Sequence, residues 1–71
     1  MSAAQTDGAA RLEKFEAMLA AVQAQYADTT AQMERLKAAG RVKSATYRQL
    51  MGRKLTYGTM LDLYKLYDLE D

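Results

Sequence analysis

The sequence contains no cysteine, histidine, proline or tryptophan. The lack of cysteine excludes disulfide scaffolds, thiol nucleophiles and zinc sites built on thiolates. The lack of histidine excludes imidazole acid–base chemistry and serine–histidine triads. The remaining residue types offer no constellation of acid, base and nucleophile. We therefore expect a protein that is not an enzyme and that uses no catalytic residue, cofactor or metal.

Long apolar runs are also missing. No window approaches the roughly 18 consecutive apolar residues that a membrane span requires. The first eight residues have neither the cationic nor the apolar segment of a secretory leader, so we expect a cytoplasmic protein with no membrane partner and no small-molecule substrate. These eight residues are small and polar, which predicts a flexible tail over 1–8 and a single domain over 9–71.

The composition that remains favours a folded chain, since 49% of the 71 residues are hydrophobic and 27% are charged. From Leu12 to Leu36, apolar residues are spaced alternately three and four apart, and Thr29 is the one polar member of the series. A sustained repeat of seven residues is typical of a helix that packs along one seam. It predicts a long helix over about 9–39, closed by Gly40.

The opposite side of this helix carries a second repeat. Alanine recurs every seven residues, at Ala10, Ala17, Ala24, Ala31 and Ala38. One interpretation is a solvent-facing surface that uses alanine for its helix propensity. The other is a close contact between two such helices, because small side chains let backbones approach.

A second helix is expected over about 45–69, after a short connection. Ser44 or Thr46 can cap its start, and Thr46 with Gln49 fits a capping box. Folding the chain back between the two helices places their apolar seams against each other. Polar Thr29 then falls opposite Lys54, the one charged residue within the second seam. The fold class is therefore all-α, an antiparallel helical hairpin.

The second helix has more apolar surface than one neighbour can cover. Small chains without a disulfide or a metal often complete a core by association, so we expect a homodimer that forms a four-helix bundle. The candidate dimer interface consists of Leu55, Met60, Leu63, Leu66 and Tyr67. The alternative is a monomer in which a break at Gly52 or Gly58 lets residues 55–69 fold back as a third helix.

Charge is distributed unevenly along the chain. Residues 35–54 carry seven basic residues and no acidic one, whereas residues 1–34 and 55–71 each carry three more acids than bases. The candidate contacts for an anion or a partner are Arg41, Lys43, Arg48, Arg53 and Lys54. They suit nucleic-acid phosphates or an acidic protein, or the acidic end of a second subunit.

Two classes of function follow from these features. The first is a small non-enzymatic adaptor that acts as a homodimer, and the second is a nucleic-acid-binding regulator that uses the basic segment 35–54. A weak helix-turn-helix pattern over 50–60 belongs to the second class. It would place a recognition helix from Tyr57 onward, with Asp62 and only one base, Lys65.

Overall fold

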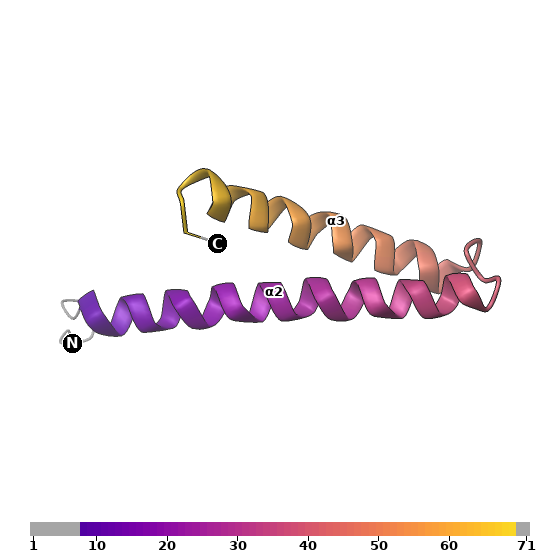
Figure 1. Ribbon diagram of the computed structural model, residues 1–71, viewed down its shortest axis with the longest axis horizontal. Helices are drawn as coiled ribbons and strands as arrows, with labels where there is room; N and C mark the ends of the chain where they lie inside the picture. Colours follow the sequence, from indigo (N-terminus) through magenta and orange to yellow (C-terminus); the bar gives the residue numbers. More distant parts are fainter. Residues whose placement is uncertain (1–7, 70–71) are drawn as a thin grey trace.

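The structure, a computed structural model, describes residues 8–69. Two helices, α2 (Gly8–Ala38) and α3 (Ala45–Leu66), lie side by side and run in opposite directions (Figure 1). The all-α antiparallel hairpin expected from the sequence is confirmed. Residues 1–7 of the expected tail lie outside the described residues, and Gly8 is already the first residue of α2.

The end of α2 is set by Gly40. This glycine has a φ of 74°, and its N–H donates to the carbonyl of Lys37 at 3.0 Å. The next N–H, of Arg41, donates to the carbonyl of Leu36 at 2.8 Å. This pair of bonds is the Schellman motif, in which a left-handed residue satisfies the last carbonyls of a helix. The predicted role of Gly40 is therefore confirmed.

We expect Gly40→Ala to lower the free energy of unfolding by about 1 kcal/mol, because an L side chain is strained in the left-handed region. A Cβ at this position would meet nothing within 4 Å, so the loss comes from the backbone alone. Urea denaturation measures the change, with Gly40→Asn as the matched control, since asparagine tolerates this conformation. Equal stability of Gly40→Ala and the parent chain would contradict the assignment.

Ser44 begins α3. Its backbone is extended, and its hydroxyl accepts a hydrogen bond from the N–H of Tyr47 at 3.1 Å. The same hydroxyl donates to the carbonyl of Arg41 at 2.8 Å, which ties the connection to the helix start. Of the two predicted caps, Ser44 is thus the correct one. The capping box of Thr46 with Gln49 is wrong, because Thr46 already lies inside α3 and a cap needs a non-helical backbone.

Helix α3 continues without a break through Gly52 and Gly58. The alternative of a third helix over 55–69 is therefore wrong, and so is the helix-turn-helix pattern that needs a turn within 50–60. Each glycine disfavours the helix by about 1 kcal/mol. Packing of the inner face of α3 against α2, before and after both glycines, offsets this cost, as tertiary contacts commonly do for helices in proteins.

The other end of α3 differs from the prediction. The helix ends at Leu66 and not at 69, because Asp68 adopts a left-handed φ of 57°. The N–H of Leu69 donates to the carbonyl of Tyr64 at 2.8 Å, and that of Asp68 donates to Lys65 at 3.0 Å. This repeats the bonding at Gly40 with an aspartate in the glycine position, which such short polar side chains tolerate.

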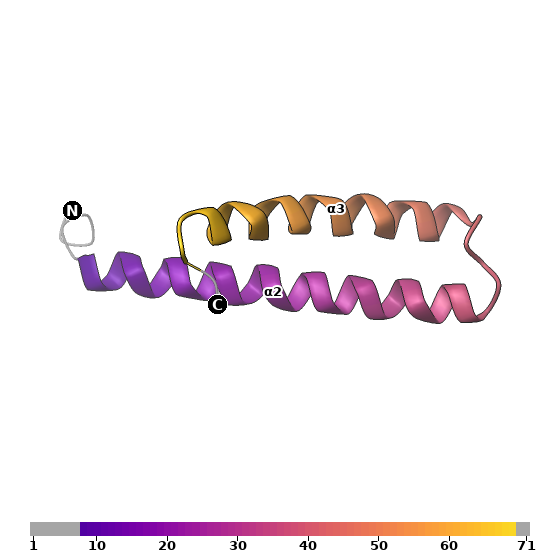
Figure 2. The same ribbon diagram turned by 45° about the horizontal axis from the view of Figure 1, so that its top comes forward.

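The core lies between the inner faces of the two helices (Figure 2). The buried residues of α2 and α3 all belong to the predicted seams: Leu19, Val22, Thr29, Met33, Leu50, Leu61 and Tyr64. Near the open end of the hairpin, the rings of Phe15 and Tyr64 meet edge to face with centroids 5.5 Å apart. The predicted burial is confirmed over most of both seams, but Leu12, the first residue of the first seam, is 59% exposed because α3 ends at Leu66, before it reaches this part of α2. The outer surface of α3 is left available for other contacts.

Candidate interaction surfaces

Four of the five residues in the predicted dimer interface lie on the surface of the hairpin. Leu55, Leu66 and Tyr67 are 67%, 72% and 70% exposed, and Leu63 is 55% exposed. Met60 is different, because it is partly buried and packs against the core cluster. At 3.6 residues per turn, Leu63 and Leu66 face away from α2. Leu55 lies at the edge of this outer side, where it also lines a groove with Met33 of α2. The structure thus brings the three leucines together and turns Met60 inward.

Between these leucines, α3 presents glycine and threonine. The hydroxyl of Thr59 donates to the carbonyl of Leu55 at 2.9 Å, and that of Thr56 donates to Gly52 at 3.1 Å. Because both hydroxyls are bonded to their own helix, they are already satisfied there. The threonines and the exposed leucines form a row of uncharged residues, called the outer stripe below, and the exposed Asp62 borders this row. The outer stripe consists of Gly52, Leu55, Thr59, Leu63 and Leu66.

The basic candidates do not form a single patch. Arg41 and Lys43 are exposed in the connection between the helices, and Arg48 is exposed in the first turns of α3. A guanidinium nitrogen of Arg48 lies 3.5 Å from the carbonyl of Lys43, which holds the arginine over the turn. Arg53 is also exposed, but helical geometry places it on another side of α3.

Lys54 is half-buried on the inner side of α3. Its Nζ lies over the ring of Tyr26, 5.7 Å from the ring centroid. Tyr26 lies on α2, one helical turn before the buried Thr29. A cation–π contact of this kind is worth about 0.5–1 kcal/mol. The predicted polar layer of Thr29 and Lys54 therefore also includes Tyr26, because the ammonium of Lys54 lies over the ring of Tyr26 on α2. Lys54 is thus half-buried, whereas the other four anion-binding candidates are exposed.

We expect Lys54→Leu to change the free energy of unfolding by less than about 1 kcal/mol. The substitution removes the cation–π contact, but leucine adds apolar burial against α2 to a similar extent. Thermal unfolding followed by circular dichroism measures the difference. Arg53→Leu serves as the control, since Arg53 is exposed on the same helix. A loss above about 2 kcal/mol would mean that the lysine has a stronger partner than Tyr26.

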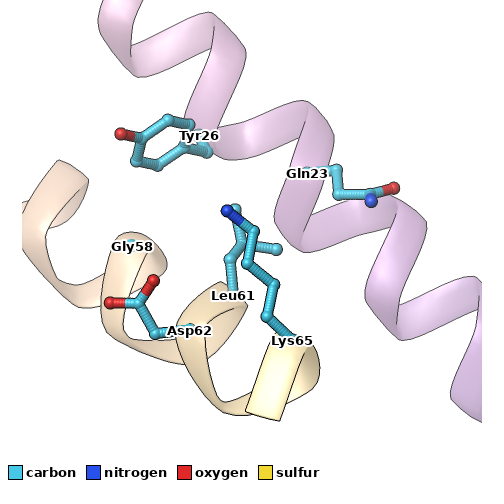
Figure 3. A pocket seen from close by; sticks show the side chains of 6 residues that line it. All are labelled: Gln23, Tyr26, Gly58, Leu61, Asp62 and Lys65. Atoms are coloured by element: carbon cyan, nitrogen blue, oxygen red, sulfur yellow. The ribbon is translucent and has the colours of Figure 1, made fainter. Parts of the chain in front are cut away.

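A hollow between the helices is lined by Gln23, Tyr26, Gly58, Leu61, Asp62 and Lys65 (Figure 3). It measures about 360 Å³, and a Cβ added at Gly58 would lie 3.4 Å from the ring of Tyr26. Lys65 extends along it toward α2, and Asp62 lies on the same helix. The hollow adjoins a groove of about 500 Å³ whose apolar lining includes Met33, Met51 and Leu55. The lining of the hollow includes one carboxylate, that of Asp62, and one amine, that of Lys65.

Within residues 8–69, no three carboxylates come together as a possible metal site. Neither helix in that range has the length and apolar character to cross a bilayer. Comparisons with protein-family models, with curated proteins and with solved structures found no match to this chain.

Proposed function

We propose that the chain is a small, cytoplasmic, non-enzymatic helical interaction protein that acts as a homodimer of hairpins with four helices in all. The observation that carries this proposal is the outer stripe. It sets three exposed leucines on one face of α3 with no charged residue among them. A helix with apolar side chains on both its inner and outer faces is typical of one that is covered on both sides.

The small core of one hairpin supports the same proposal. Only six hydrophobic residues are buried among the described residues, and one polar residue, Thr29, is buried with them. Burial of apolar surface stabilises by about 25 cal/mol per Å², so a second copy over the outer stripe would add a substantial share of the folding free energy. Chains of this size without a disulfide or a metal commonly gain stability by association.

Light scattering coupled to gel filtration tests the proposal. We expect a mass of about twice 7.9 kDa at high micromolar concentration. Leu63→Glu should shift the mass to that of one chain, because it places a charge in the outer stripe. Leu12→Glu is the matched control and should leave the dimer intact, since Leu12 is similarly exposed, at 59%, but lies on α2. A folded species of one-chain mass in the unmodified protein would contradict the proposal.

The basic turn supports the alternative of a nucleic-acid-binding regulator. The observation in its favour is that Arg41, Lys43 and Arg48 are exposed at one end of the hairpin, within a segment that has no acidic residue. Binding through phosphates weakens steeply as salt concentration rises. Titration of a labelled duplex at low and at moderate salt distinguishes the two functions. Binding that is lost in salt and in Arg41→Glu supports the regulator, whereas no binding at low salt leaves the homodimeric adaptor.

A further inference from the structure

The outer stripe has a spacing that reads the same in both directions along α3. Its five residues, in order Gly52, Leu55, Thr59, Leu63 and Leu66, are separated by three, four, four and three positions. A two-fold axis perpendicular to the helix at Thr59 therefore superimposes the stripe on itself in reverse. Leu55 of one copy then faces Leu63 of the other, and Thr59 faces Thr59. Self-complementarity of this kind is what a symmetric dimer interface requires.

Side-chain sizes fit this arrangement. The same axis places Leu66 of one copy opposite Gly52 of the other, so that one of the most exposed leucines meets the smallest residue of the stripe. A Cβ built at Gly52 has no neighbour within 4 Å, so the space above this glycine is open within a single hairpin. Alternating large and small residues across a helix pair lets the two surfaces interdigitate.

Charge favours the antiparallel direction. The first half of α3 carries Arg48 and Arg53, whereas Asp68 follows its end and the sequence continues with two further acids. An axis at Thr59 sets the basic first half of α3 in one copy alongside the acidic end of α3 in the other, although Arg53 then lies at the level of Lys65. A parallel pair would place arginines beside arginines, and like charges across an interface disfavour association. Basic residues near the start of a helix and acidic residues near its end oppose the helix dipole, as Arg48 and Asp68 do in α3. The antiparallel pairing offsets this unfavourable arrangement.

We propose that the second copy docks antiparallel on the outer stripe, α3 against α3, with the two-fold axis at Thr59. This inference rests on the proposed homodimer and specifies its surface and direction. The two α3 helices then lie at the centre of the assembly and the two α2 helices on the outside. The alanine repeat of α2 remains exposed, which assigns it to the first of its two interpretations.

Single cysteines introduced into this cysteine-free chain test the arrangement by air oxidation. Thr59→Cys should convert to a covalent dimer, because the two residues meet at the axis and a disulfide needs Cα atoms within about 7 Å. Gly52→Cys alone should stay monomeric on a non-reducing gel, since its two copies would lie about 21 Å apart along the helix. An equimolar mixture of Gly52→Cys and Leu66→Cys should cross-link between the two variants. Circular dichroism of each reduced variant checks that the hairpin is folded.

Three results would overturn the inference. Cross-linking of Gly52→Cys with itself would indicate a parallel pair. Cross-linking of Ala24→Cys, but not of Thr59→Cys, would place the contact on the alanine repeat of α2, and the homodimer would stand without this interface. A one-chain mass in light scattering would instead remove the homodimer itself, so the two proposals fail in distinguishable ways.

Discussion

Leu61→Asp is expected to unfold the hairpin. Leu61 is 9% exposed and belongs to the core cluster with Leu19, Val22 and Tyr64. An aspartate there would bury an unpaired carboxylate and remove a leucine from the main contact between the helices, at a cost of more than about 3 kcal/mol. A chain of this length has a total stability of roughly 4 to 10 kcal/mol. The expected result is a loss of the cooperative thermal transition in circular dichroism.

Leu12→Asp is the control for this substitution. Leu12 lies in the first turns of α2 and is mostly exposed, so the same chemical change should shift the transition only slightly. Both variants must be compared at one protein concentration, because association makes the midpoint depend on concentration. A parent-like melting curve for Leu61→Asp would show that this residue is not part of the core.

Tyr64→Ala is expected to have the second largest effect. Tyr64 is 7% exposed, and its ring packs edge to face against Phe15 with the planes at 81°. Truncation of a buried aromatic residue removes transfer free energy and leaves a cavity, which costs about 3 to 5 kcal/mol. Phe15 would lose its ring partner at the same time, so the open end of the hairpin should separate first. Urea denaturation measures the loss.

Tyr64→Phe separates the ring from the hydroxyl. It keeps the edge-to-face pair with Phe15, and aromatic pairs of this geometry contribute about 0.5 to 1.5 kcal/mol beyond the area that they bury. We expect it to stay within about 1 kcal/mol of the parent protein. A loss as large as that of Tyr64→Ala would assign the stabilisation to the hydroxyl and contradict the packing described above.

The sequence predicted the hairpin well because two independent patterns agreed. The buried residues of both helices all come from the seven-residue repeat of the first helix and the seam of the second, including Thr29 in the middle of the first, although Leu12 at the start of the repeat is exposed. Gly40 was also predictable, since glycine at the end of an apolar repeat is typical of a helix stop. Periodicity and glycine placement are properties of short stretches, and they can be interpreted without knowledge of the tertiary structure.

Features that depend on conformation in three dimensions were harder to predict. The end of α3 was missed by three residues, because the left-handed position is occupied by Asp68 and not by a glycine. The inward turn of Met60 and the stacking of Lys54 on Tyr26 depend on the rotation of α3 about its axis. The pattern of apolar and charged residues in the sequence does not determine the rotation of α3 about its axis to within one residue. The five basic candidates therefore separated onto different sides.

The polar layer in the middle of the hairpin has a consequence for folding. Its members are Thr29 and Tyr26 on α2 and Lys54 on α3. A shift of α3 by one heptad in either direction would move Lys54 away from Thr29 and Tyr26. Its ammonium would then lie against Val22 or Leu36. Such a shifted hairpin would keep most of its apolar contacts and, without Lys54, would compete with the native fold. One lysine thus favours the native register over registers shifted by a heptad, as single polar residues do in coiled coils.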